Sequence, residues 1–261
     1  MSKKKIYGNC RICGIEKKLT QEHYIPRAAG GAMKLKLYKG EELMKTLHND
    51  KDGKNYKPKG IFKQNGLAEY TLCKECNEYS GLYYDKDFAL FYNIIHFGVQ
   101  RNINIPEHTT TEQYLRGKSM KMTLKKLKPF NIAKRILVSF SSVEHAGLTE
   151  RNSEIRKALL DKYYTPQTDD FGIYLSLHIG NSLHYGTIAT LNLNGKISAF
   201  AGIENDFIAL YLTTDTNTKA KGLEGCLDIT HWLTDFEYDE EQDIELDLSF
   251  NQSKNIMFPV G

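Results

Sequence analysis

The chain has 261 residues, of which 41% are hydrophobic and 26% are charged, and its formal net charge is +3. This composition excludes a disordered or fibrous protein, and no apolar run approaches the roughly 20 residues that span a bilayer. The length allows one large domain or two small ones, each with its own core. The basic start, MSKKKIYGNC, lacks the apolar segment of a signal peptide, so we expect a cytoplasmic protein with no membrane partner.

The small net charge conceals a large asymmetry between the two halves of the chain. Residues 1–135 carry 27 Lys and Arg against 13 Asp and Glu, a balance of +14, whereas residues 136–261 carry 8 against 19, a balance of −11. A basic half of this size favours a nucleic-acid partner for the N-terminal part. The alternative is two solvated surfaces of opposite sign that attract each other.

The first ninety residues are rich in turns and contain four of the five cysteines. The segments LTQEHYI, residues 19–25, and LAEYTL, residues 67–72, are typical of short strands. Between them, the lysine-rich stretch 33–63 predicts an insertion with a long loop. Residues 82–98 have helical periodicity, which predicts an amphipathic helix. The apolar residues on one face of that helix are Phe88, Phe91, Tyr92 and Ile95.

A basic middle region follows, and we expect it to be helical. The first predicted helix covers residues 120–140, and the second covers residues 149–164 with Thr149 as its cap. From Phe171 onward hydrophobic and polar residues alternate, which predicts a series of strands.

Within the predicted C-terminal strands, Asn194-Gly195 is a strong signal for a hairpin turn. The acidic tail 234–250 ends in a further predicted strand, and Trp232, the only tryptophan, is expected to anchor the core of this part. The sequence therefore predicts an α+β fold with a helical middle and a mainly antiparallel β region at its C-terminus.

Four of the cysteines form two pairs, Cys10-x-x-Cys13 and Cys73-x-x-Cys76. Disulfides are rare in the cytoplasm, so paired spacings of this kind indicate a metal site. Each pair turns two thiolates toward one point, and two pairs supply the tetrahedral sulfur shell that a structural zinc ion prefers. The fifth cysteine, Cys226, has no partner at such a spacing, and we expect it to be a small buried side chain.

Between and directly after these pairs lie Glu22-His23 and Asn77. The arrangement C-x-x-C … E-H-x-x-P-x-x-x-G-G … C-x-x-C-N resembles the HNH nuclease superfamily, also called the ββα-metal or His-Me finger. It is most similar to the branch with four cysteines, which includes phage junction resolvases and many bacterial HNH proteins. The segment CNEYSGLYYD, residues 76–85, also resembles that branch. The resemblance covers about residues 8–90, and no family is identified for the rest of the chain.

These residues also make chemical sense without the resemblance. A strand can deliver His23 to a scissile phosphate, where a neutral imidazole accepts a proton from water near pH 7. Neighbouring residues of a strand point to opposite sides, so Glu22 and His23 need a twisted or bulged backbone to share one site. One carboxylate and one amide, from Glu22 and Asn77, form a sparse oxygen shell that suits Mg²⁺ or Mn²⁺.

The resemblance implies that residues 1–98 form a zinc-stapled ββα-metal finger in which His23 is the general base. It further implies that Glu22 and Asn77 ligate a catalytic Mg²⁺ or Mn²⁺ ion, while the cysteines hold a structural zinc. Members of the superfamily often place an Asn between the two strands to orient the base. Asn65 is the best match for that role here, although it is equally a turn residue of its loop.

The resemblance therefore implies a metal-dependent HNH endonuclease that hydrolyses phosphodiester bonds of DNA, with RNA less favoured, in restriction or antiviral defence against phage. Behind the finger we expect a basic helical region at 99–165 and an acidic β-rich domain at 166–261, which could contact a protein partner or a second copy of the chain. Contacts to phosphate are expected from cationic residues in both basic segments. These residues are Arg27, Lys34, Lys36, Lys125 and Lys126.

Two other functions stay open. In the first, the chain is a non-catalytic zinc module that binds nucleic acid or a protein partner, although a mere scaffold would not need Glu22, His23 and Asn77. In the second, the acidic C-terminal region recruits a partner or regulates the nuclease. Its stretch Asp235–Asp247 could compete with DNA for the basic half, or it could be a solvated acidic tail.

Overall fold

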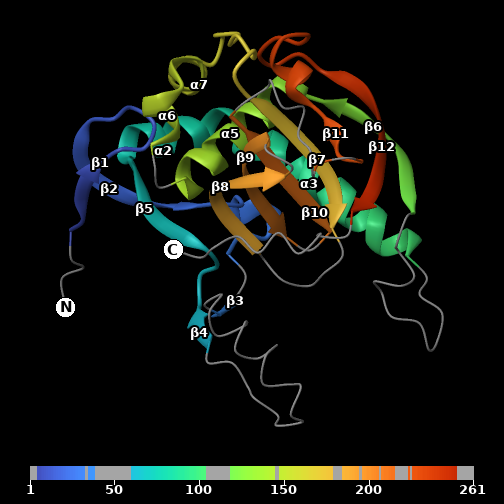
Figure 1. The fold of residues 1–261 in the computed structure, drawn as a ribbon, viewed down its shortest axis with the longest axis horizontal. Helices are drawn as coiled ribbons and strands as arrows, with labels where there is room; N and C mark the ends of the chain where they lie inside the picture. The colour runs from blue at the N-terminus through green and yellow to red at the C-terminus, as the bar shows by residue number, and fades with distance from the viewer. Residues whose placement is uncertain are drawn as a thin grey trace.

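The structure is a computed structural model, and within the residues that it describes the fold is α+β, as predicted, with several sheets and few helices (Figure 1). None of the described helices is both long and apolar enough to cross a membrane. The described residues are 5–32, 35–38, 60–103, 118–144, 147–178, 184–193, 196–205, 207–214, 223 and 225–251.

A three-stranded antiparallel sheet forms the N-terminal part, in the order β1-β2-β5. Strands β1 (Tyr7–Asn9) and β2 (Glu16–His23) are joined by a tight turn that begins at Cys10. Strand β5 (Ala68–Cys73) runs directly into helix α2 (Lys74–Tyr83), so this strand and this helix share the second cysteine pair. β2 and β5 confirm the two strands that the sequence predicts.

Between β2 and β5, the described residues form three short elements. The 3-10 helix η1 (Arg27–Ala29) follows Pro26 directly, and β3 (Leu35–Tyr38) pairs antiparallel with β4 (Gly60–Lys63). These two strands bracket most of the predicted lysine-rich insertion, of which residues 39–59 lie outside the described residues.

Helix α3 (Asp85–Asn102) confirms the amphipathic helix predicted at residues 82–98. It is separated from α2 by Tyr84, which is buried and has a non-helical backbone. The four apolar residues that the periodicity selects are all buried: Phe88, Phe91, Tyr92 and Ile95.

The prediction of a helix at residues 120–140 is wrong for the first part of that range. Strand β6 (Ser119–Leu127) occupies that part, and helix α5 (Pro129–Val143) begins only at Pro129. A proline suits the first turn of a helix because the N–H that it lacks would have no partner there. Over residues 119–125 of β6, polar Ser, Lys and Thr side chains alternate with Met and Leu, which is the period of a strand.

The second predicted helix, at residues 149–164, is shorter and divided. It consists of α6 (Leu148–Arg151) and α7 (Ser153–Leu160), which meet at Asn152. Asn152 caps α7, because its side chain accepts a hydrogen bond of 3.0 Å from a first-turn N–H. The predicted cap, Thr149, instead donates its hydroxyl at 2.6 Å to a backbone carbonyl in the first cysteine turn.

The C-terminal half supplies most of a seven-stranded sheet in the order β6-β12-β7-β10-β9-β8, with β11 beside β7. Its described pairings are antiparallel except that of β12 with β7, which confirms the predicted β region. The hairpin residues Asn194-Gly195 lie outside the described residues, between antiparallel β8 and β9. The remaining strands are β7 (Gly172–His178), β8 (His184–Leu193), β9 (Lys196–Asn205), β10 (Ile208–Thr213), β11 (Leu227–Asp228) and β12 (Gln242–Asn251).

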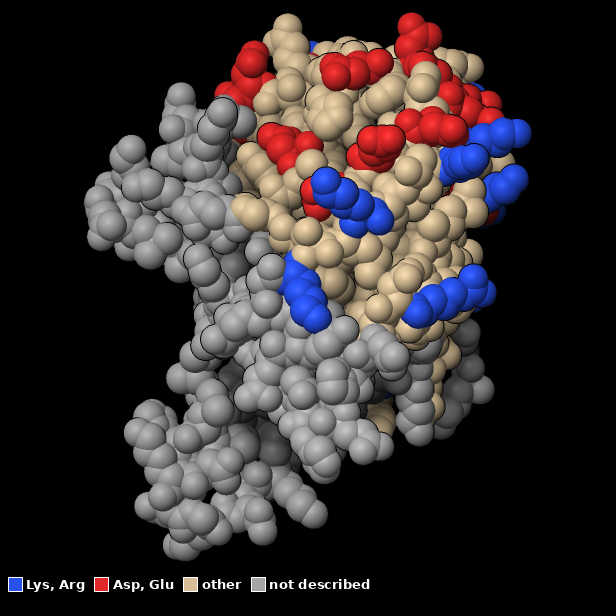
Figure 2. Space-filling model, turned by 90° about the vertical axis from the view of Figure 1, so that its right-hand side faces the viewer, with Lys and Arg blue, Asp and Glu red and all other residues tan. Residues whose placement is uncertain are grey.

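The last part of the acidic stretch Asp235–Asp247 belongs to this sheet, since β12 begins at Gln242 and lies between basic β6 and β7. Lys121 of β6 pairs with Asp247 of β12 at 3.5 Å, and Lys128 pairs with Asp239 at 2.5 Å. Figure 2 shows lysine, arginine and acidic side chains close together on this side of the molecule. To compete with DNA, β12 would have to leave two neighbouring strands, whereas residues 235–241 precede this strand, and the proposed competition stays a prediction.

Helix α5 lies between the small N-terminal sheet and the large sheet, and all of its residues are buried (Figure 1). It contacts β5 on one side and β8, β9 and the 3-10 helix η3 (Thr230–Leu233) on the other. One cluster of buried side chains accordingly runs from Cys10 to Phe250. The helix therefore brings the N-terminal and C-terminal parts of the chain onto a shared core.

Trp232 of η3 anchors the C-terminal part of this core, as the sequence predicts. Its side chain is 1% exposed, and its ring packs edge-to-face against Phe91 of α3 at 5.7 Å. Truncation to alanine leaves a large cavity, so Trp232→Ala should lower the free energy of unfolding by about 3–5 kcal/mol in urea denaturation. Leu82→Ala is the control, because Leu82 is 74% exposed and its loss should cost less than about 0.5 kcal/mol. Equal stabilities of the two variants would contradict this packing.

Candidate functional site

Four cysteine thiols converge where the first turn, β5 and α2 meet. Their sulfur atoms all lie within 4.8 Å of one another. Thiolates bound about 2.3 Å from a tetrahedral zinc ion are roughly 3.8 Å apart, so the cluster has the size of such a site. The four residues, Cys10, Cys13, Cys73 and Cys76, are thus positioned to bind a metal ion, consistent with the predicted structural zinc.

The local backbone explains how the first pair reaches this point. The N–H of Gly14 donates to the carbonyl of Cys10 at 2.8 Å, and Gly14 has a φ of +74°, a left-handed conformation that favours glycine. The fifth cysteine, Cys226, lies outside the cluster and is partly exposed, not buried as predicted. The difference arises because Cys226 belongs to the turn closed by its own N–H on the Leu223 carbonyl.

The end of β2 is irregularly paired, close to Glu22 and His23. Its pairing with β5 shifts register between Thr20 and Gln21. Directly after this bulge, Glu22 and His23 are 6% and 7% exposed, so both neighbouring side chains are buried. A regular strand would direct them to opposite sides. The pairing therefore contains a bulge just before Glu22 and His23, and its extra residue is Thr71 of β5.

His23 contacts the loop that precedes β5, since its Nε2 lies 3.0 Å from the carbonyl oxygen of Asn65. The structure thus brings Asn65 to the predicted base, through its backbone and not its side chain. Burial is the main cause that lowers the pKa of His23, and the charges of Arg27 and Arg135 lower it further, while the Asn65 carbonyl opposes them. The imidazole is accordingly neutral near pH 7.

Two glycines allow the chain segments around this contact to approach closely. Gly66 has a φ of +69°, and a Cβ placed on it would lie 1.8 Å from the carbonyl oxygen of Gly31. A Cβ on Gly31 would in turn lie 1.7 Å from the carbonyl oxygen of Ile25. The second glycine of the Gly-Gly motif is therefore required because the backbone after β2 turns back on itself beneath the loop that holds Asn65.

Asn77 stands in the first turn of α2 and is tied to the same bulge. Its Nδ2 donates to the hydroxyl of Thr20 at 2.8 Å and to the carbonyl of Gln21 at 3.0 Å. Both amide hydrogens are thereby directed at β2, so the amide oxygen is the atom of this side chain that can meet a cation. The contacts place Asn77 beside the two residues that precede Glu22.

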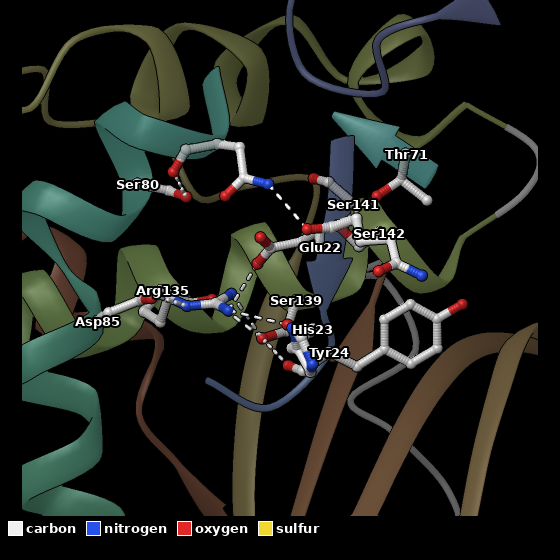
Figure 3. Close-up of polar contacts among 12 residues, drawn as sticks. Glu22, His23, Tyr24, Thr71, Ser80, Asp85, Arg135, Ser139, Ser141 and Ser142 are labelled. Carbon is white, nitrogen blue, oxygen red and sulfur yellow. Dashed lines mark hydrogen bonds and ion pairs between the residues drawn. The ribbon is translucent and has the colours of Figure 1, made fainter. Parts of the chain in front are cut away.

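Glu22 has a partner that the sequence did not suggest, the buried Arg135 of α5. Arg135 Nη2 donates to Glu22 Oε1 at 2.7 Å (Figure 3). Burial raises the pKa of Glu22 to about 7, against the opposing charge of Arg135. The signal in the sequence was the setting of Arg135 between Ile132 and Ile136 on a helix that starts at a proline, which is typical of a buried position and not of a phosphate contact.

The structure describes the side chains of three of the five residues that are predicted to contact phosphate. Arg27, Lys125 and Lys126 are exposed, whereas Lys34 and the side chain of Lys36 lie outside the described residues. The last two basic residues of the middle region, Lys134 and Arg135, are fully buried and face no solvent. Apolar neighbours on α5 bury the whole helix, and its two cations are satisfied inside the protein.

No family model, curated protein or solved structure matches this chain. The chemistry of the candidate site therefore rests on the positions of its own residues.

Proposed function

We propose that this protein is a metal-dependent endonuclease of the HNH type that hydrolyses phosphodiester bonds of DNA. The observation that carries the proposal is the end of β2, where Glu22 and His23 are both buried directly after the bulge in the pairing with β5. Asn77 of α2 is hydrogen-bonded to that same bulge. Three residue types that phosphodiester hydrolysis needs thus share one strand end next to a four-cysteine cluster.

His23 is the general base of this proposal. Its Nε2 faces the carbonyl of Asn65, and a carbonyl can only accept, so Nε2 carries the hydrogen. The other ring nitrogen, Nδ1, is then the atom that accepts a proton from the attacking water. The lowered pKa of His23 keeps this nitrogen unprotonated at neutral pH. Asn65 holds the ring in this tautomer through its backbone.

Glu22 and Asn77 are the residues that would hold the catalytic cation. They offer a carboxylate and an amide oxygen, a hard and sparse donor set that fits Mg²⁺ or Mn²⁺. Such an ion supplies Lewis-acid stabilisation of the charge that develops on the phosphate and on the leaving oxygen. The protein's contribution is to fix both donors against β2, the strand that also positions the base.

The elements around these residues also support the proposal of an HNH nuclease. The succession β2, β5 and α2, with one cysteine pair before β2 and the other at the junction of β5 and α2, fits the zinc-stapled ββα-metal finger, which we assign to residues 1–98. Arg27 is exposed, and so are lysines of β6 in the basic region 99–165. These side chains would contact DNA phosphates whatever the base sequence of the DNA. The β-rich domain 166–261 would contact a protein partner, and we favour a role in restriction or phage defence.

A second candidate function is a non-catalytic zinc module that binds nucleic acid or a protein partner. The ion pair between Glu22 and Arg135 favours it, because a purely structural carboxylate would be paired in the same way. The two candidates differ in whether a divalent ion and a water molecule are used at this carboxylate.

Incubation of the zinc-loaded protein with supercoiled plasmid tests the proposal. With Mg²⁺ or Mn²⁺ the plasmid should be nicked and linearised, and Glu22→Gln should lose this cleavage because an uncharged amide is a weak ligand. Glu69→Gln is the matched control, since Glu69 is the cross-strand partner of Glu22 on β5 and is partly exposed. Absence of cleavage of plasmid, single-stranded DNA and RNA with either metal would favour the second candidate instead.

A further inference from the structure

The buried guanidinium of Arg135 makes four hydrogen bonds that converge on the candidate site. Its side chain is 1% exposed. Besides Glu22 Oε1, Nη2 donates to the backbone carbonyl of His23 at 3.0 Å, Nε donates to Asp85 Oδ1 at 2.5 Å, and Nη1 donates to Ser139 Oγ at 3.0 Å. All three nitrogens are therefore used, and Figure 3 shows the side chain extending from α5 between Asp85 and Glu22.

We propose that Arg135 is a positioning residue of the candidate site, which holds the Glu22 carboxylate and the His23 backbone in the geometry that cation binding and cleavage require. This inference rests on the proposed function and extends it to a residue of α5, which lies outside the segment that carries the motifs. Arg135 does not itself contact the reacting atoms.

Ser139, one helical turn after Arg135, completes the support. Its hydroxyl donates to the carbonyl of Tyr24 at 2.6 Å. Arg135 and Ser139 thus hold two consecutive carbonyls, those of His23 and Tyr24, from one face of α5. Because these carbonyls cannot rotate freely, the backbone after the bulge is fixed, and with it the direction in which the His23 ring leaves β2.

The guanidinium also binds two carboxylates at the site. Glu22 and Asp85 accept from different nitrogens of the same group, so a single cation joins the end of β2 to the start of α3. Glu22 uses only Oε1 in this contact, which leaves Oε2 outside the hydrogen bond. A carboxylate held by one oxygen in this way keeps a defined orientation while it can still bind an ion, which is the usual role of supporting residues around a metal ligand.

Arginine is required here because of its shape as well as its charge. A planar fork with five N–H donors can reach acceptors on β2, α3 and α5 together, whereas a lysine ammonium is a single point on a flexible stem. Arg135→Lys should therefore keep the buried charge and the fold but lose the orientation of Glu22. Arg135→Gln should lose both the charge and the orientation.

The test measures Mn²⁺ binding to the zinc-loaded protein by electron paramagnetic resonance, alongside plasmid cleavage over a range of Mg²⁺ concentrations. We expect Arg135→Gln and Arg135→Lys to weaken Mn²⁺ binding by about 10–100-fold. We also expect them to raise the Mg²⁺ concentration needed for cleavage, while zinc content stays unchanged. Thermal unfolding identifies any variant that fails to fold. If Arg135→Gln does not fold, the Mn²⁺ affinity of Arg135→Lys, which keeps the charge, tests the positioning role.

Lys134→Met is the matched control. Lys134 is the neighbouring cation of α5 and is equally buried, but it donates to the carbonyl of Asp161 at 2.7 Å, away from the candidate site. Its loss should lower stability without changing Mn²⁺ affinity by more than about threefold. A purely structural role of Arg135 predicts that the Lys134 and Arg135 variants behave alike.

The outcomes separate this inference from the proposed function. Folded Arg135 variants with wild-type Mn²⁺ affinity and wild-type cleavage would overturn the positioning role and leave the nuclease intact. Mn²⁺ binding that depends on Arg135, in a wild-type protein that cuts no nucleic acid, would overturn the nuclease and leave the positioning role. A wild-type protein that binds no Mn²⁺ and cuts nothing would overturn both.

Discussion

Replacement of Cys73 by serine should release the bound zinc and unfold the N-terminal sheet. Cys73 is the last residue of β5 and is 1% exposed, so the cluster connects β5 and α2 to the turn between β1 and β2. Zinc-finger peptides gain about 10–16 kcal/mol in apparent free energy from their metal at pH 7, because no preformed site exists in the unfolded chain. The effect should exceed that of any single truncation in the core.

The thiols of the cluster show why a cation is needed there. A hydrogen bond from Cys76 lowers the pKa of Cys10 to about 4, whereas burial raises the pKa of Cys73 to about 11. A thiolate is therefore favoured at Cys10, but four thiolates this close together repel one another strongly unless a divalent ion offsets their charge. Zinc binding must release protons, so acidification should release zinc.

Elemental analysis and thermal unfolding measure this prediction. The native protein should contain one zinc per chain, and Cys73→Ser should contain almost none. A loss of about 5 kcal/mol would already lower the thermal midpoint by roughly 10–20 °C in a chain of this size. Cys226→Ser is the control, because Cys226 lies outside the cluster, and it should keep the zinc. A zinc-free native protein with a normal midpoint would refute the structural role of the metal.

Much of the fold could be predicted because its signals are local. Alternation of apolar and polar residues identified the strands β7 to β10 and β12, and the periodicity of α3 selected its buried face. The two C-x-x-C spacings identified the cysteine cluster. In each case residues close in the sequence share one geometric constraint, either the period of a strand or helix or the shape of a turn. A short stretch of sequence is therefore enough to predict the element.

β6 was predicted as a helix because its apolar residues satisfy two periods at once. Met120, Leu124 and Leu127 match helical spacing, while Met120, Met122 and Leu124 alternate with polar residues. The strand conformation of β6 is decided by β12, which pairs with it from more than one hundred residues away and brings acidic side chains to its lysines. Such a partner is absent from any local window, so tertiary pairing overrides the ambiguous pattern.

Arg135 was missed for a related reason. Its contact with Glu22 joins residues 113 positions apart, and a basic residue in a basic region suggests a solvent-facing side chain. The helix around it is long, apolar and buried between two sheets, so its cations must find acceptors inside the protein. The motif residues of β2 and α2 could therefore be found from the sequence alone. The supporting residues on the polar face of α5 could not, because they reach the site only through tertiary contacts.

Replacement of His23 by alanine should abolish cleavage and leave the fold and the zinc in place. His23 makes its ring contact with a loop carbonyl, and the strand around it is held by pairing with β5 and by Arg135 on its backbone, which alanine retains. Loss of a positioned general base reduces the rate by about 10²–10⁴-fold. DNA binding should change little, because the imidazole is neutral near pH 7 and contributes no charge to phosphate contacts.

The control and the pH dependence make this prediction specific to a base. His231→Ala removes an exposed histidine of η3 and should cleave like the wild type. Burial lowers the pKa of His23, so its imidazole is the competent free base at and above pH 7, and cleavage should decline only when acid protonates it. Added imidazole should restore part of the rate in His23→Ala, because a small base can occupy the vacated space beside the water. If His23→Ala cuts as fast as the wild type, the water is activated by another group, and the buried imidazole of His23 serves packing alone.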